Sequence, residues 1–193
     1  MDIFEIKQAI TDQKLHPLIE KRWSPRAFSS REIQADDLEK IFTAASWAPS
    51  ANNEQPWSYI YATRGTPEFD SLWNCLSDGN KSWSANAPVI FVSLYRKTFK
   101  RNGKENKWAL HDLGMANAQL LLQATELDIY GHLMAGFDMH KLKERLNLDD
   151  DLVPACMGVL GYLGNPDSLE EPYRTREKAD RKRNNLNEFV QKL

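Results

Sequence analysis

The alternation of apolar strand patterns with segments of helical periodicity constrains the fold more than any other sequence feature. The run from Pro88 to Tyr95 is short and largely apolar, which is typical of a strand buried on both faces. Between Trp57 and Thr63 aromatic residues occupy every second position, which predicts another strand. Because helical patterns separate such runs, the sequence predicts a mixed sandwich, either α/β or α+β.

Helix signals supply further elements. Asp36 followed by Glu39 has the pattern of a capping box, so we expect a helix from there to about Ala48, ended by Pro49. Leu38, Ile41, Phe42 and Ala45 recur at helical spacing in this helix, and Trp47, Trp57 and Trp73 are expected to lie on core faces. Three further helices are predicted: one over 66–79 that ends at a glycine, one over 111–127, and one that begins after a cap at residue 138. Two further strands are predicted, over 129–134 and 153–163.

The length of 193 residues suits one domain, residues 1–193, and is short for two. Residues 164–185 are charged and lack periodicity, which predicts a surface segment. Leu186, Phe189 and Val190 then give the end of this arm, residues 164–193, an apolar tip. The tip either packs on another surface, including a second subunit, or frays, and these residues alone leave the two outcomes equal.

Composition excludes several classes of protein. With 25 basic and 27 acidic residues the net charge is −2, which disfavours nucleic-acid binding. Cys75 and Cys156 have no metal or disulfide spacing, and the four histidines form no ligand cluster, so no metal site is expected. Residues 1–5 are acidic rather than basic and no apolar signal region follows, so we expect a cytoplasmic protein with no membrane attachment.

Three segments resist an ordinary explanation. Residues 21–28 place two arginines and a serine around Pro25, where they can present several donors to one anion, although an isolated basic turn would look similar. Within residues 48–57, two prolines flank four neutral polar side chains. The amide side chains among them either satisfy a tight loop or form hydrogen bonds to a polar ring system. Residues 181–183 are a basic triplet, which is more often a surface patch.

Together these segments resemble the FMN-dependent nitroreductase-like flavoprotein family, from about His16 to Val190. The likeness rests on Arg-x-Ser-x-Arg at 22–26 and Ala-Pro-Ser-Ala-x-Asn-x-Gln-Pro-Trp at 48–57. Residues 80–88, 111–114, 134–138 and 161–166 support it. The resemblance implies an α+β fold with a central, mostly antiparallel sheet flanked by helices. It also implies that the C-terminal arm is exchanged in an intertwined homodimer with two flavin sites at the interface.

The resemblance assigns expected roles to individual residues. The phosphate and ribityl chain of FMN would be held by Arg22, Ser24, Arg181 and Arg183, within a segment that includes Trp23. The polar edge of the flavin would face Arg26 and Asn80, and its ring would lie along the backbone of Met134, Ala135 and Gly136. The other subunit would contribute Pro49, Ser50, Ala51 and Asn53. No protein side chain is expected to be catalytic, because the flavin carries the chemistry.

The chain departs from the family pattern at 183–186, which read Arg-Asn-Asn-Leu where the family often has Arg-Lys-Pro-Leu. Arg181 and Arg183 are both present, but the sequence does not determine the geometry of the arm. The loop from Lys97 to Trp108, which varies in the family and often contacts substrate, is basic and polar here and names no substrate.

The implied activity is hydride transfer from NADH or NADPH through FMN to a flat, electron-poor small molecule such as a nitroaromatic, a quinone or an activated alkene. The two substrates would bind in turn, in a ping-pong mechanism. Other superfamily chemistries, dehalogenation and flavin breakdown, are the alternative among enzymes. A nucleic-acid-binding module is the alternative outside enzymes, suggested by basic clusters and six tryptophans. The colour of the purified protein, yellow or colourless, separates the flavin enzymes from the nucleic-acid-binding module.

Overall fold

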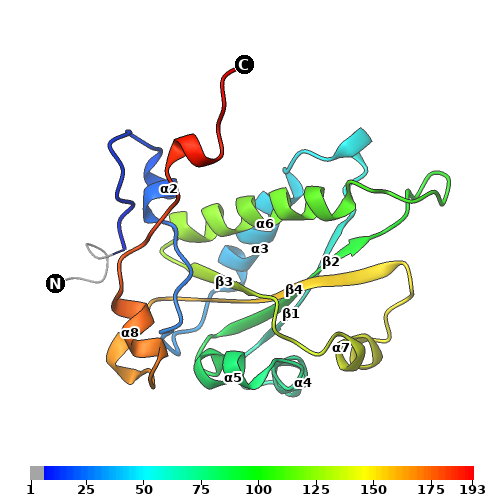
Figure 1. The fold of residues 1–193 in the computed structure, drawn as a ribbon. Helices are drawn as coiled ribbons and strands as arrows, with labels where there is room; N and C mark the ends of the chain where they lie inside the picture. Colours follow the sequence, from blue (N-terminus) through cyan, green and yellow to red (C-terminus); the bar gives the residue numbers. More distant parts are fainter. Residues whose placement is uncertain (1–6) are drawn as a thin grey trace.

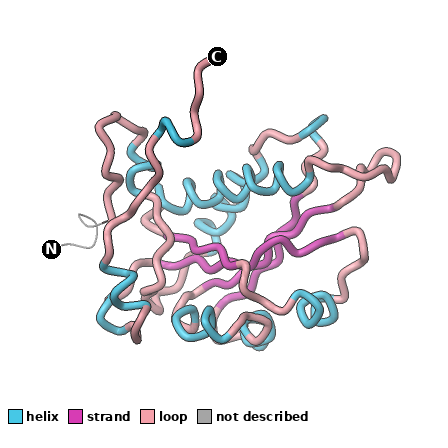
Figure 2. The backbone as a smooth tube through the Cα atoms, in the orientation of Figure 1, coloured by secondary structure: helices cyan, strands magenta, loops and turns pink. Residues whose placement is uncertain are grey.

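A four-stranded sheet lies at the centre of the computed structural model, which describes residues 7–193 (Figures 1 and 2). Its strands are β1 (Trp57–Thr63), β2 (Val89–Arg96), β3 (Tyr130–Met134) and β4 (Leu152–Gly161). They pair in the order β1-β2-β4-β3, and every pairing is antiparallel. All four predicted strands are therefore confirmed, each within two residues of its expected bounds.

Helices cover both faces of this sheet (Figure 1). One face packs against α3 (Ala35–Ser46) and α6 (Ala109–Glu126), and the other against α4 (Pro67–Trp73), α5 (Asp78–Ser84) and α7 (Met139–Leu146). The short helices α2 (Pro17–Lys21) and α8 (Tyr173–Lys178) lie at one end of the sheet. Single 3-10 turns occur at Ala51–Asn53, Pro166–Ser168 and Leu186–Glu188.

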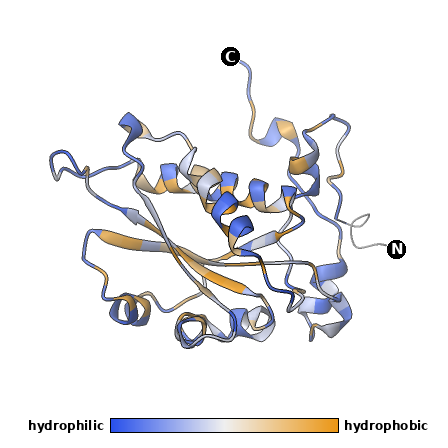
Figure 3. Ribbon diagram, turned by 180° about the vertical axis from the view of Figure 1, so that it is seen from behind, coloured by the Kyte–Doolittle hydropathy of each residue, from blue (hydrophilic) through white to orange (hydrophobic). Residues whose placement is uncertain are grey.

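Strand β2 divides the core into two. Ile90 and Val92 point to the layer of α4, α5 and α7, whereas Phe91 points to the layer of α3 and α6, and all three are fully buried. Figure 3 shows the apolar colour concentrated on the strands. Phe91 fits because Gly158 lies opposite it: a Cβ there would be 2.4 Å from the ring. The glycine thus lets neighbouring strands pair across a large aromatic side chain.

The helix boundaries correct three predictions. Asp36 lies within the first turn of α3, whose N-cap is Gln34 and has no side-chain cap bond, so the capping box was wrong. Gly79 lies inside α5 and does not end the preceding helix. Trp47 is 80% exposed, because the buried stripe of α3 continues to Ala48 and leaves Trp47 on the other side. The cap at Asp138 is confirmed, since its carboxylate accepts the N–H of Lys141 at 3.0 Å.

The end of the C-terminal arm is exposed to solvent. Leu186 is 66% exposed and Phe189 68%, and Figure 1 shows the last residues extending away from the sheet. Residues 1–6, on which the prediction about a signal peptide rests, lie outside the described residues. No helix within residues 7–193 is long and apolar enough to cross a membrane.

Candidate functional site

A small pocket gathers cations from the two ends of the chain. It encloses about 200 Å³ and is lined by Lys7, Arg22, Trp23, Ser24, Arg26, Arg176, Glu177, Arg181 and Arg183. Six of these side chains are cationic and one is acidic. Guanidinium groups present their N–H donors as a planar fork, which suits a phosphate or carboxylate group. The structure therefore brings together the basic segments predicted at 22–26 and 181–183.

The arginines crowd one another. Burial lowers the pKa of Arg22, and the nearby charge of Arg183 lowers it further. The pKa of Arg181 is lowered by burial, then by Arg22 and Arg183. An anion in the pocket would relieve this repulsion. Arg181 also connects the arm to the N-terminal segment. Its Nη1 donates to the backbone carbonyls of Lys7 at 2.8 Å and Glu20 at 2.6 Å.

The backbone behind the pocket is fixed by two side chains from distant elements. The Oε1 atom of Glu177, on α8, accepts the N–H groups of Arg26 at 2.8 Å and Ala27 at 2.9 Å. The Nδ1 atom of His132, on β3, lies 2.8 Å from the carbonyl oxygen of Pro25, to which it donates as a neutral ring. These bonds hold the Ser24–Ala27 backbone in place and leave its polar side chains available to a ligand.

His132 is held neutral by its surroundings. Its ring packs against Trp83 with 4.5 Å between centroids and an angle of 35° between the ring planes. Burial lowers the pKa of His132 to about 4, the bond to Pro25 opposes this shift, and the charge of Arg26 adds to it. The sequence alone left each histidine as either a surface or a hydrogen-bonded side chain, and the contact with Pro25 shows that His132 is hydrogen-bonded.

A second group of predicted residues lies where β3 ends. The Nδ2 atom of Asn80 donates to the carbonyl of Gly136 at 2.9 Å, and the N–H of Ser77 donates to the same oxygen at 3.0 Å. A Cβ on Gly136 would lie 2.7 Å from Ser77 Oγ and 2.8 Å from Asn80 Nδ2, so the close approach requires glycine. Met134 is 3% exposed, which leaves mainly backbone atoms of this stretch accessible.

Arg26 connects the two groups. Its guanidinium carbon lies 5.9 Å from the ring centroids of both Trp83 and Tyr173. The hydroxyl of Tyr173 donates to the carbonyl of Gly79 at 2.7 Å, directly before Asn80. Sequence reasoning missed Tyr173 and Glu177, because both lie in the stretch of residues 164–185 that carries no periodic signal.

The third predicted group, residues 49–53, lies elsewhere. The N–H of Ala51 donates to Asp112 Oδ2 at 2.9 Å, in the first turn of α6. The arginine pocket lies near the other end of α6, where Lys21 forms an ion pair with Asp128. With 18 residues α6 is about 27 Å long. One chain therefore does not bring all the predicted residues to one place (Figure 1).

The backbone of this third group is strained. Asn52, Asn53 and Gln55 have φ values of 56°, 54° and 49°, which are uncommon for residues other than glycine. The side chains of the segment contribute to its stability, since the N–H of Gln55 donates to Ser50 Oγ at 3.1 Å. Backbone strain of this kind concentrates at functional sites, which is an observation independent of the sequence motif.

Other features of the described residues offer less chemistry. No group of three or more His, Cys, Asp or Glu side chains within residues 7–193 could hold a metal ion. A larger hollow of about 670 Å³ lies beside α3 and α6 next to Trp47, but it contains no arrangement of nucleophile and base. The donor set of the arginine pocket fits a phosphorylated ligand, and the Asn80–Gly136 group offers an adjoining polar edge and backbone groups.

Known proteins are similar to this chain in sequence and in fold. The profile of the nitroreductase family matches residues 19–74 and 64–162. An Archaeoglobus fulgidus protein with the provisional name NADH dehydrogenase/NAD(P)H nitroreductase is 32% identical over 150 residues, which cover 75% of this chain and 83% of that protein.

Solved structures agree. A crystal structure described as an oxidoreductase containing FMN superposes with a TM-score of 0.89 at 29% identity, covering 94% of this chain and 93% of the other. A nitroreductase family protein from Clostridium difficile gives a TM-score of 0.69 at 25% identity, covering 90% of this chain and 95% of the other. The predicted α+β fold is thereby confirmed. This chain belongs to the nitroreductase family.

Proposed function

We propose that the protein is an FMN-dependent oxidoreductase that uses NADH or NADPH. The observation that carries this proposal is the arginine pocket, which joins through Arg26 to the polar group of Asn80 and Gly136. A terminal phosphate suits the pocket, and the chain lacks the glycine fingerprint that would accompany an adenosine-binding fold. The similar structure that contains FMN supports the same cofactor.

FMN, when bound, supplies the redox chemistry, by accepting a hydride from the nicotinamide and passing it to a second substrate. The protein chain would bind the cofactor and orient it. Arg22, Arg183 and Ser24 would hold the phosphate and ribityl chain, with Arg181 completing the pocket. Arg26 would place a cation at the polar edge of the ring, where negative charge develops. The Gly136 backbone would lie along the ring, because Met134 is buried and this stretch offers mainly backbone groups.

The complete site would need a second copy of the chain. The strained segment at 49–53 lies at one end of α6 and the arginine pocket near the other, so two chains running in opposite directions would bring them together. The open face of α6, with Leu110 at 55% exposure and Gly114, is unpartnered within residues 7–193. The apolar tip of the arm is exposed as well. A homodimer that buries both surfaces accounts for these features.

We further propose a ping-pong mechanism with a flat, electron-poor acceptor. No histidine or cysteine lines the arginine pocket, and His132 is engaged with Pro25. Hydride transfer needs alignment and charge stabilisation more than a protein acid or base. The two substrates would then use one pocket in turn and exclude each other. The single-domain organisation and the cytoplasmic location stay predictions from the sequence.

Chromatography of the chromophore released from the purified protein tests the cofactor. We expect FMN; recovery of FAD, or no binding after refolding with excess FMN, would overturn the proposal. Steady-state kinetics with NADPH and a quinone should give parallel double-reciprocal lines. Intersecting lines would show a ternary complex and exclude the ping-pong order while leaving the cofactor assignment intact.

A further inference from the structure

A short hairpin projects from the end of β2 and leads into α6 (Figure 1). Residues 97–107, here called the basic hairpin, are closed by a bridge between Thr98 and Glu105. The N–H of Phe99 donates to the carbonyl of Lys104 at 2.8 Å, and the N–H of Gly103 donates back to Phe99 at 2.8 Å. This segment, for which the sequence indicates only a polar loop, therefore has a defined shape.

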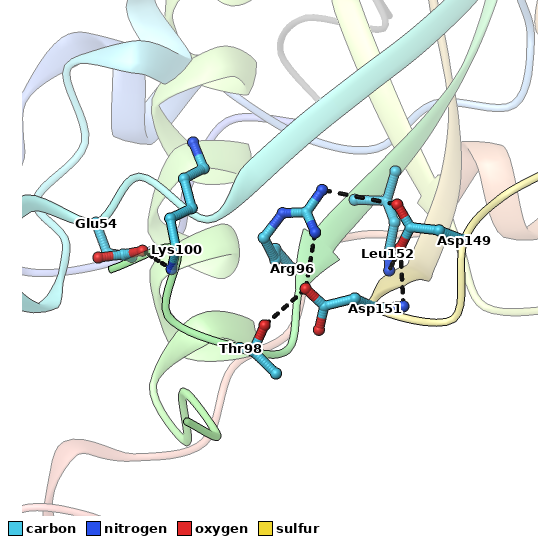
Figure 4. A network of polar contacts seen from close by, with 7 residues as sticks. All are labelled: Glu54, Arg96, Thr98, Lys100, Asp149, Asp151 and Leu152. Atoms are coloured by element: carbon cyan, nitrogen blue, oxygen red, sulfur yellow. Dashed lines mark hydrogen bonds and ion pairs between the residues drawn. The ribbon is translucent and has the colours of Figure 1, made fainter. Parts of the chain in front are cut away.

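A polar network fixes the base of the hairpin (Figure 4). The Oδ2 atom of Asp151 accepts from Arg96 Nη1 and from Thr98 Oγ1, each at 2.7 Å. The N–H of Lys97 donates to the backbone carbonyl of Asp151 at 3.0 Å, and Arg96 also lies 3.8 Å from Asp149. An arginine that pairs with two carboxylates and two further hydrogen bonds anchor the hairpin to the residues just before β4, which restricts its motion.

The hairpin concentrates positive charge. Its exposed cations are Lys97, Lys100, Arg101, Lys104 and Lys107, and its one acid is Glu105. Five cations against one acid give +4, so the rest of the chain, whose total is −2, carries −6. None of the five cationic side chains forms an ion pair with any residue from 7 to 193. Such a concentrated, unpaired charge creates a field that attracts anions.

The hairpin also lies against the strained segment of the candidate site. The carboxylate of Glu54 accepts the N–H of Lys100 at 2.5 Å, which joins the hairpin to the loop that contains Asn52 and Asn53 (Figure 4). Trp108 follows the hairpin at the start of α6, is 59% exposed, and lies 6.0 Å from the ring of His111. Cations and an exposed aromatic surface thus border the segment that reaches the flavin under the proposed function.

We propose that the basic hairpin recognises an anionic group, a phosphate or an acidic substituent, on an aromatic substrate of this enzyme. The inference rests on the proposed function, because the site that the hairpin borders is the shared flavin site. The anchored base would hold the cations at the rim, where they draw the charged substrate in, and Trp108 would face its ring. Two sources carry the required chemistry: the 2′-phosphate of NADPH, or an acidic group on the electron acceptor.

The test compares the double variant Lys100→Gln/Arg101→Gln with the control Lys143→Gln/Arg145→Gln, which removes the same charge from α7. Stopped-flow kinetics at low ionic strength would measure reduction by NADPH and NADH. In separate runs, protein reduced with dithionite would be reoxidised by 1,4-naphthoquinone or by its 2-sulfonate. We expect the hairpin variant to lose about fivefold or more in the apparent second-order constant for an anionic substrate, with a weaker salt dependence than wild type.

The pattern of losses identifies the ligand. A loss with NADPH that exceeds the loss with NADH assigns the 2′-phosphate, and a loss with the sulfonate that exceeds the loss with the neutral quinone assigns the acceptor. Equal losses with NADPH and NADH together with equal losses with the sulfonate and the neutral quinone, no loss at all, or the same losses in the control variant would overturn the proposal. A wild-type protein that binds no FMN, or that NADPH does not reduce, would instead overturn the proposed function.

Discussion

Glu177 has the most unusual environment of the single residues in the site. It is 1% exposed, its Oε1 accepts two backbone N–H groups, and its Oε2 has no hydrogen-bond partner within residues 7–193. A buried carboxylate is costly unless charges compensate for it, and the six cations around the pocket do so. Lys7 is one of them: burial lowers its pKa, and Glu177 partly restores it.

Substitution of the arginines in the pocket should weaken FMN binding far more than substitution of the neighbouring Lys182. We expect Arg22→Ala and Arg183→Ala each to weaken FMN binding at least about tenfold, because each removes a hydrogen bond to a charged group, about 1.5–3 kcal/mol. Lys182→Ala is the matched control, since Lys182 is exposed and does not line the pocket. Titration of apoprotein with FMN gives the affinities, and thermal unfolding checks the fold. Equal losses in all three variants would reduce the cluster to a general basic patch.

His132 should make stability depend on pH. Its folded pKa of about 4 lies below the unfolded value of about 6.5, so between these values only the unfolded chain binds the proton. Stability should therefore rise from about pH 4 to 6.5 and fall as the pH is lowered through this window, by up to about 3 kcal/mol.

Urea unfolding across pH 4–7 measures this contribution. The variant His132→Gln should show a flatter dependence than wild type, because an amide does not titrate. His140→Gln is the matched control, since the side chain of His140 is 86% exposed. The same steep dependence in wild type and His132→Gln would show that His132 is not the group responsible.

Among the elements, α6 has a feature that the single chain does not explain. Gly114 lies within the helix, and a Cβ placed there would meet nothing within 4 Å. Glycine in a helix costs about 1 kcal/mol relative to alanine. Close approach of a helix from a second subunit would account for it, as small residues let two backbones come near.

Enlarging Gly114 tests this interpretation. Gly114→Leu should shift the protein toward monomer in sedimentation velocity and lower its FMN content, because the larger side chain would separate the paired helices. The same leucine placed at Glu144 of α7, a side chain that is 70% exposed, should leave the dimer intact. A dimeric Gly114→Leu protein with full FMN content would remove this face of α6 from the interface.

At the scale of the whole molecule, the arm should connect two chains. Its tip exposes Leu186 and Phe189, and burial of such side chains contributes about 1.5–3 kcal/mol each. The variant Leu186→Asp/Phe189→Asp should therefore dissociate the dimer at micromolar concentration and reduce FMN content. Asn187→Asp, in the same 3-10 turn, adds charge without removing apolar surface and should not. Sedimentation equilibrium decides, and a wild-type association constant in the double variant would show that the tip is a free tail.

Several elements were predictable because their signals are local. Strand β1 matched its predicted bounds from aromatic alternation alone, and Asp138 capped its helix as expected. The failures occurred at helix ends. Asp36 looked like a cap but lies one residue inside a helix, and Trp47 fell one position away from the buried stripe of α3. One residue turns a helical side chain by about 100°, which is enough to move it from core to solvent.

The sequence by itself determined where the strands and the two long helices α3 and α6 form, and which short segments carry the arginines, amides and glycines of the site. Only the tertiary structure decided that β4 lies between β2 and β3, that Glu177 holds the backbone of Arg26 across 151 residues, and that residues 49–53 lie at the opposite end of α6 from the pocket. The physical reason is the distance along the chain over which each kind of interaction acts. Periodicity and turn chemistry act over a few residues, whereas a buried carboxylate finds its donors only after distant segments pack together.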